Sequence, residues 1–113
     1  MGHSDCIFCQ IINHKFPSEV VFESDVLLAI KDINPIAPVH ILIIPKQHIP
    51  SILEADNPGL LADIQLLAAT LARQLHLDAH GFRVVNNCGE WGGQTVSHLH
   101  YHLLGGKILG SMG

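Results

Sequence analysis

The feature that most constrains this chain lies near its C-terminal end, in residues 94–106. Three histidines alternate there with three apolar residues: His98, Leu99, His100, Tyr101, His102 and Leu103. A period of two is typical of a β-strand, because successive side chains point to opposite faces. The pattern predicts a strand that presents the imidazoles on one face and packs its apolar residues on a core with the other.

Same-face neighbours on a strand lie about 6.5–7 Å apart, so adjacent imidazoles of this run cannot hydrogen-bond each other. We expect them to line one extended ligand or to turn to different partners. The alternative interpretation is a solvated polar face, but such faces usually carry Thr, Lys and Glu. Three titratable rings in register therefore favour a functional site.

Length and composition favour a single domain over residues 1–113. Apolar residues make up 48% of the chain, which is enough for a core. No run of about 18 apolar residues predicts a membrane span, and the N-terminus lacks a signal-peptide pattern. We therefore expect a cytoplasmic protein with no membrane partner, and a loose end over residues 1–5.

The formal net charge of −4 argues against a nucleic-acid backbone as partner. A small anionic substrate is compatible with this charge, because a pocket can be electropositive within an acidic protein. The cysteines number three, and an odd number does not suggest the disulfide framework of a secreted protein. Cys88 has no partner at a recognisable spacing.

Hydrophobic periodicity and turn residues predict the remaining elements. A short helix over residues 6–12 ends before Pro17, and a long helix begins at residues 56–58 and runs to about His76. Strands are predicted over residues 20–23, 26–30, 39–44 and 82–87. This order predicts an α+β fold with a mainly antiparallel sheet of about five strands, one face of which the long helix covers.

The run His-Leu-His-Tyr-His-Leu-Leu at residues 98–104 resembles the His-x-His-x-His-x-x motif of the histidine triad (HIT) family, in which x is apolar. This family contains nucleotide hydrolases and transferases. The motif is specific here because it follows a Gly-Gly-Gln-Thr loop at residues 92–95. The resemblance extends from about Cys6 to Gly106, and the Leu-Gly-Gly ending at residues 104–106 is similar to the Hint branch, the nucleoside phosphoramidases. It implies a HIT-like fold.

The resemblance implies that His100, the middle histidine, is a nucleophile that forms a nucleotidyl-histidine intermediate. Attack on phosphorus needs an unprotonated ring nitrogen, an acceptor that holds the other nitrogen, and donors for the phosphoryl oxygens. The resemblance places His102 near the phosphate and the leaving group. His40 matches a supporting histidine of the Hint branch, while the residues alone fit a hydrogen-bonded core histidine equally well.

The resemblance also implies a nucleotide site. Asp32 matches the residue that binds the ribose hydroxyls, and a carboxylate can accept from both, although the residues alone fit a turn before Asn34-Pro35 as well. The expected phosphate contacts, just before the histidine run, are Asn87, Gly93, Gln94 and Thr95. The expected walls of a purine pocket are Ile7, Phe8, Ile11, Ile30 and Ile33. The spacing of the first three alone fits ordinary core.

Cys6 and Cys9 have the spacing of half a zinc site, and reduced buried thiols are the alternative. Galactose-1-phosphate uridylyltransferases and many bacterial HIT proteins bind zinc through a Cys-x-x-Cys, a histidine after the third strand and the first triad histidine. The resemblance maps these ligands to Cys6, Cys9, His48 and His98. Animal Hint proteins lack the cysteines and work without zinc, which implies a structural role for the metal.

The implied function is hydrolysis of purine nucleoside phosphoramidates or related adenylyl conjugates to the nucleoside monophosphate. Two alternatives stay open. One is a dinucleoside polyphosphate hydrolase or nucleotidyltransferase of the same superfamily, and the other is a non-catalytic, zinc-stapled module that binds nucleotide. The residues do not name the physiological substrate, because fold and family do not fix it. Residues 108–113 depart from the tryptophan- and proline-bearing tail of Hint proteins, which leaves the leaving-group preference open.

We also expect a homodimer, since HIT domains pair through the long helix and the strand before the triad. The predicted helix is richer in leucine than one narrow stripe requires, with Leu60, Leu61, Leu66, Leu67, Leu71 and Leu75. Two-fold pairing is the commonest way for such a surface to be covered.

Overall fold

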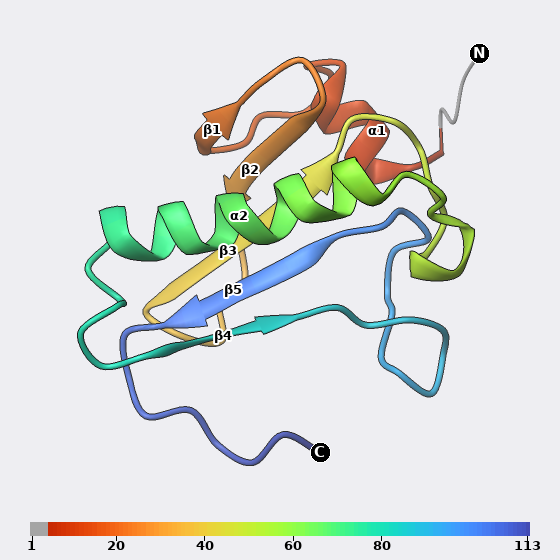
Figure 1. Cartoon of the computed structure of the whole chain (residues 1–113). Helices are drawn as coiled ribbons and strands as arrows, with labels where there is room; N and C mark the ends of the chain where they lie inside the picture. Colours follow the sequence, from red (N-terminus) through yellow and green to blue (C-terminus); the bar gives the residue numbers. More distant parts are fainter. Residues whose placement is uncertain (1–4) are drawn as a thin grey trace.

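The computed structural model describes residues 5–113, so the loose end expected over residues 1–5 falls, apart from Asp5, outside the described part. Five strands form one sheet: β1 (Val20–Glu23), β2 (Leu27–Lys31), β3 (Val39–Pro45), β4 (Phe82–Val85) and β5 (Tyr101–Gly105). The helices are α1 (Ile7–Ile12), α2 (Pro58–Gln74) and the 3-10 turn η1 (Ile52–Glu54). Figure 1 shows α2 lying across the sheet.

The strand order is β1-β2-β3-β5-β4, and every neighbouring pair is antiparallel. The sheet confirms the predicted α+β fold. β3 and β5 are neighbouring interior strands, and Leu42 of β3 is paired with His102 of β5. The chain around the central histidines is therefore held by strands on both sides.

Helix α2 begins where the sequence predicts. The Asn57 side chain caps it by accepting a hydrogen bond from the Leu60 N–H at 3.2 Å, and Pro58 occupies the first turn. Its buried face packs on one side of the sheet, over β3 and β5. Of the six leucines that motivated a dimer, Leu66 alone is exposed, at 65%. The others pack within this chain, because a five-stranded sheet needs a broad apolar helix face.

Alternation along β2 separates two apolar clusters. Leu27 and Ala29 join the larger cluster under α2. Leu28 and Ile30 face the opposite side, where they form a smaller cluster with Phe8 of α1, Leu42 and Ile44. The face of the sheet that α2 leaves uncovered is thus partly closed by the short helix, and His102 lies on this face beside Leu42.

The alternation predicted one continuous strand through the histidine run, and this prediction is wrong. Strand β5 begins only at Tyr101, so His102 is in the strand while His98 and His100 precede it. The Leu99 N–H donates to the carbonyl oxygen of Ile49 at 2.6 Å, which takes this residue out of the ladder. Strand β4 likewise ends at Val85, two residues earlier than predicted.

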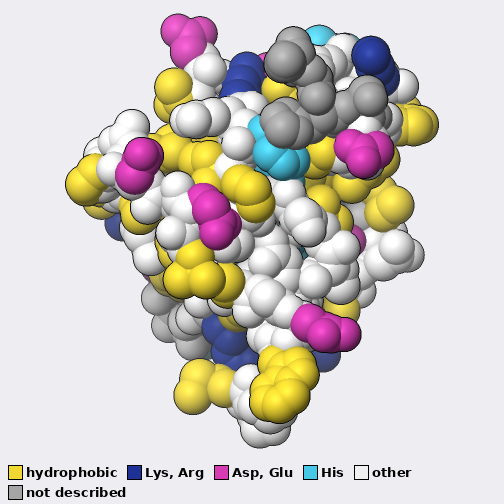
Figure 2. All heavy atoms as spheres, turned by 90° about the vertical axis from the view of Figure 1, so that its right-hand side faces the viewer, with side chains coloured by type: hydrophobic (Ala, Val, Ile, Leu, Met, Phe, Trp, Pro, Cys, Tyr) yellow, Lys and Arg dark blue, Asp and Glu magenta, His cyan; other side chains and the backbone are white. Residues whose placement is uncertain are grey.

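Acidic, basic and apolar side chains are interspersed on the face drawn in Figure 2, and no patch of one charge dominates it. Within residues 5–113, the helices are too short or too polar to cross a bilayer.

Candidate active site

A cavity of about 480 Å³ lies on the α1 side of the sheet. Its lining includes all five apolar residues expected around a base: Ile7, Phe8, Ile11, Ile30 and Ile33. It also includes four polar residues of the expected site: Asp32, Thr95, His100 and His102. The structure thus brings together residues that are up to 95 positions apart, from Ile7 to His102.

The same cavity has lining residues that the sequence reasoning missed: Phe16, Pro17, Ser18, Leu42 and Val96. The sheet register could have indicated Leu42, since it pairs with His102. The loop after α1, residues 16–18, carried no pattern that pointed to a ligand.

His100 is only 4% exposed, and its surroundings fix the position of its proton. Nδ1 lies 2.7 Å from the carbonyl oxygen of His98. Because a carbonyl can only accept, Nδ1 carries the proton and donates, and Nε2 keeps its lone pair. Burial lowers the pKa of His100, so the ring is neutral at pH 7. These are the properties required of an imidazole that attacks phosphorus.

A second chain of hydrogen bonds orients His102. The Ile36 N–H donates to Nδ1 of His40 at 3.2 Å, so the proton of a neutral His40 is on Nε2. That Nε2–H donates to Nδ1 of His102 at 2.9 Å, which leaves the His102 proton on its own Nε2. We call Ile36, His40 and His102 the histidine chain. Burial, helped by His100 and His40, lowers the pKa of His102 to about 4. His102 is therefore a neutral hydrogen-bond donor at pH 7.

Asp32 serves both as a turn residue and as a pocket residue. Its Oδ1 accepts a hydrogen bond from the Asn34 N–H at 2.8 Å, as expected before Pro35. Its Oδ2 lies 3.4 Å from Nε2 of His40. Because each carboxylate oxygen has two lone pairs, the carboxylate retains acceptor capacity toward the cavity that it lines.

Several donors of the expected phosphate contacts are already used within the protein. The N–H groups of Gly93 and Gln94 donate to the carbonyl oxygens of Glu90 and Gly89, respectively. The Asn87 amide donates to the carbonyl oxygen of Gly92 at 2.7 Å with one of its two hydrogens. Thr95 is exposed, and its N–H and hydroxyl have no partner among residues 5–113. Among the four expected phosphate contacts, Thr95 is therefore the one whose donors are all available.

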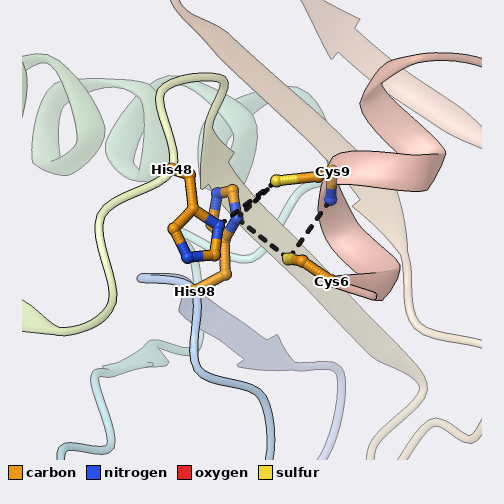
Figure 3. Close-up of side chains that lie close together, drawn as sticks. All are labelled: Cys6, Cys9, His48 and His98. Carbon is orange, nitrogen blue, oxygen red and sulfur yellow. Dashed lines mark hydrogen bonds between the residues drawn. The ribbon is translucent and has the colours of Figure 1, made fainter. Parts of the chain in front are cut away.

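Cys6, Cys9, His48 and His98, which we call the cysteine cluster, point toward one another from α1, the segment after β3 and the start of the histidine run (Figure 3). The Cys9 sulfur lies 3.2 Å from Nδ1 of His48, and the Cys6 sulfur lies 3.4 Å from Nδ1 of His98. Tetrahedral zinc, with bonds of about 2.3 Å to sulfur and about 2.0–2.1 Å to nitrogen, would separate such ligands by about 3.6 Å. The four groups therefore fit a zinc ion.

The proton on His98 also suits a metal. Its Nε2 lies 2.8 Å from the carbonyl oxygen of Pro45 and must donate to it, so the lone pair of Nδ1 faces the two sulfurs. Without a metal, burial and the neighbouring Cys6 raise the pKa of the Cys9 thiol to about 11. A bound cation would supply the positive charge that holds the thiols as thiolates.

Asp32, His40 and His102 also place ligand atoms within 4.8 Å of one another, but they do not suit a metal. The Ile36 N–H occupies Nδ1 of His40 and fixes the proton on Nε2, the atom that would have to bind the ion. This group is therefore a hydrogen-bonded chain. Cys88 belongs to neither cluster.

Comparisons with known proteins agree with this geometry. The model of the HIT domain family matches residues 13–108. The chain is 41% identical to the purine nucleoside phosphoramidase of Escherichia coli K12 over 96% of this chain and 92% of the relative. The structure of a HIT family hydrolase from Clostridium thermocellum has a TM-score of 0.93 and 47% identity, covering 98% of both chains.

A zinc-bound histidine triad family protein from Mycobacterium smegmatis has a TM-score of 0.83 and 31% identity, covering 94% of this chain and 78% of that one. The resemblance expected from the histidine run is thus confirmed over nearly the whole sequence. By the family match and by these relatives, which include hydrolases, the chain belongs to the HIT family.

Proposed function

We propose that this protein hydrolyses purine nucleoside phosphoramidates or related adenylyl conjugates to a nucleoside monophosphate through a nucleotidyl-histidine at His100. The observation that carries the proposal is the tautomer of His100, whose Nδ1 proton is committed to the carbonyl oxygen of His98 at 2.7 Å. Its Nε2 lone pair is then available in a ring that lines the cavity with Asp32. The name of the Escherichia coli relative supports cleavage of a phosphorus–nitrogen bond.

In the proposed complex the purine lies in the apolar part of the cavity, between Ile7, Phe8 and Ile30. Asp32 accepts hydrogen bonds from the ribose hydroxyls. The phosphate reaches His100, with Thr95 as donor to its oxygens. The Phe8 ring, whose centroid is 5.0 Å from that of His100, limits the motion of the nucleophile.

The reaction then has two steps. Nε2 of His100 attacks phosphorus, the phosphorus–nitrogen bond breaks, and the amine leaves with a proton taken from water. A second water attacks the nucleotidyl-histidine, the bond to Nε2 breaks, and the monophosphate forms as that water loses a proton. The neutral His102 donates its Nε2–H to a phosphoryl oxygen, where charge develops in each transition state. It is too weak an acid to protonate the amine itself.

We further propose that the cysteine cluster holds a structural zinc ion. The sulfur-to-nitrogen distances of 3.2 and 3.4 Å support this, as does the zinc-bound relative from Mycobacterium smegmatis. When bound, zinc would supply a fixed positive charge and a cross-link. The cluster's own residues join α1, which carries Phe8, to the chain that leads into His100.

We also propose a homodimer. Strand β4 is at the edge of the sheet, and Phe82 on this strand is 40% exposed. Leu66 is the exposed leucine of α2. A dimer would extend the sheet across this edge and cover both residues. Light scattering at micromolar concentration tests this, and a monomeric mass would refute it.

The test of the function is rapid quench with two labelled substrates, an adenosine 5′-phosphoramidate and a dinucleoside polyphosphate. We expect faster turnover of the phosphoramidate and transient label on His100. Preferred cleavage of the polyphosphate would support the superfamily alternative. Binding of both compounds with no turnover would support the non-catalytic module. Label on another residue would overturn the assignment of His100.

A further inference from the structure

Both polar atoms of the Gln94 side chain make hydrogen bonds within the protein. Its Oε1 accepts a hydrogen bond from the Gly89 N–H at 2.9 Å. Its Nε2 donates to the carbonyl oxygen of Pro50 at 2.8 Å and to that of Val96 at 2.9 Å. Both amide hydrogens are used, and the backbone N–H donates to Gly89 as well. Gln94 therefore has no N–H left for a phosphate oxygen.

These hydrogen bonds connect Gln94 to three different segments of the chain. Gly89 lies in the loop after β4, Pro50 follows the cysteine-cluster residue His48, and Val96 follows Thr95. The Ile49 carbonyl, next to Pro50, accepts from the Leu99 N–H at 2.6 Å. The segment around Ile49 is thus bonded to the chain on both sides of Thr95.

Apolar packing does not hold the loop in place. Residues 89–93 are exposed, and Trp91, the one large apolar side chain among them, is 99% exposed. At Gly92, a Cβ atom would lie 2.3 Å from the carbonyl oxygen of Cys88, so the turn needs glycine there. Val96, on the other side of Thr95, packs against the apolar cluster around Phe8. On its loop side, the position of Thr95 therefore depends on polar bonds, of which Gln94 makes the most.

We propose that Gln94 is a positioning residue that holds the Thr95 hydroxyl against the substrate phosphate. This inference rests on the proposed function, because Thr95 is assigned to the phosphate there. It differs from the expectation that Gln94 contacts the phosphate itself, since its amide is already bonded to Gly89, Pro50 and Val96.

Two substitutions of nearly the same size remove the bonds in different ways. Gln94→Met keeps the length of the side chain and loses all three of its hydrogen bonds. Gln94→Glu places a carboxylate oxygen against the carbonyl oxygens of Pro50 and Val96, which repel it. Displacing a donor by about 1 Å can cost about 10²-fold in rate, so we expect kcat to fall by about 10- to 100-fold. KM should change little, because the apolar pocket is untouched.

A double-mutant cycle separates positioning from direct contact. If Gln94 acts through Thr95, Gln94→Met should cost less than about 3-fold in a Thr95→Val background. If the two residues contact the phosphate independently, the losses multiply, and the proposal is overturned. Circular dichroism and thermal melting identify a variant that fails to fold, and Gln65→Glu, on the exposed face of α2, is the matched control.

A pH profile supplies a second readout. At low pH the carboxyl of Gln94→Glu is protonated and regains one donor, so its rate relative to the wild type should rise as the pH falls. A ratio that does not change with pH would count against the proposal. If the wild type binds AMP but cleaves no phosphoramidate, the proposed function fails. The position of Thr95 in a crystal structure of Gln94→Met then decides the role of Gln94, and an unmoved Thr95 overturns it.

Discussion

The cysteine cluster and the histidine chain use histidines of the same run for opposite purposes. His98 and His102 each hydrogen-bond one ring nitrogen to a neighbour and turn the other toward a site. The difference begins at the backbone. The carbonyl oxygen of Pro45 accepts a hydrogen bond from Nε2–H of His98, whereas the Ile36 N–H donates a hydrogen bond to Nδ1 of His40.

This difference decides what each site can bind. The bond to a carbonyl leaves a lone pair on the opposite nitrogen of His98, and a lone pair binds a cation. The hydrogen bond from the Ile36 N–H leaves the proton of His40 on Nε2. That N–H donates to Nδ1 of His102, so the proton of His102 is likewise on its Nε2. The histidine chain therefore ends in a donor, which suits a phosphate oxygen. Two groups with similar spacing thus differ in chemistry because of one backbone atom each.

The largest effect is expected at His100, which lies between the two groups. We expect His100→Asn to lower kcat by more than about 10³-fold, because the covalent nucleophile is lost. AMP affinity should stay within about 3-fold, since Asp32 and the apolar pocket remain. Single-turnover kinetics and calorimetry measure the two quantities. The exposed His80→Asn serves as control, and near-normal turnover of His100→Asn would contradict the mechanism.

The second effect tests the cysteine cluster. Purified without chelator, the protein should contain about one zinc per chain by elemental analysis. Cys6→Ser should lose the metal and about 2–4 kcal/mol of stability, and a loss of this size lowers Tm by roughly 10–20 °C. The chemical rate should fall less than about 3-fold. Cys88→Ser, outside the cluster, should change neither quantity, and metal-free wild-type protein would refute the zinc proposal.

The third effect tests the histidine chain. His40→Ala removes the donor to Nδ1 of His102, so the His102 proton can move to the wrong nitrogen, and kcat should fall by about 10- to 100-fold. His40→Gln can still donate an amide N–H to Nδ1 and should recover part of the rate. Equal rates for the two variants would show that the direction of the hydrogen bond does not matter. Zinc content should be unchanged in both.

The sequence indicated which residues lie near one another better than it indicated the hydrogen bonds between them. Period-two alternation predicted correctly that Leu99, Tyr101 and Leu103 enter the core under α2. It could not predict that His98 turns away from His100, because that depends on carbonyl oxygens of Pro45 and Ile49 from another part of the chain. A pattern of side-chain polarity says nothing of where a hydrogen-bonded ladder begins.

His40 and Gln94 illustrate the same limit. The sequence left His40 between a hydrogen-bonded core residue and a supporting catalytic partner. Its burial and its bonds to Ile36 and His102 fit both, because His102 lines the cavity. Gln94 was expected at the phosphate from its place in the loop. Its three bonds reach residues up to 44 positions away, which no local pattern encodes.

The smallest effect concerns stability and pH. His102 has its pKa lowered to about 4 in the folded protein, against about 6.5 in an unfolded chain. Below about pH 6.5 the unfolded chain therefore binds the extra proton, and the free energy of unfolding falls as the pH decreases toward 4. After allowance for partial solvent exposure, we expect His102 to account for about 1–2 kcal/mol of this loss.

Urea unfolding of the wild type and of His102→Asn at pH 7 and at pH 5 isolates this contribution. Acid also weakens the cysteine cluster, but it does so in both proteins, so the difference between their pH slopes belongs to His102. The slope of His102→Asn should be shallower, and that of the exposed His80→Asn should match the wild type. Parallel slopes for all three would mean that His102 accepts a proton in the folded protein, and the histidine chain would then no longer end in a neutral donor.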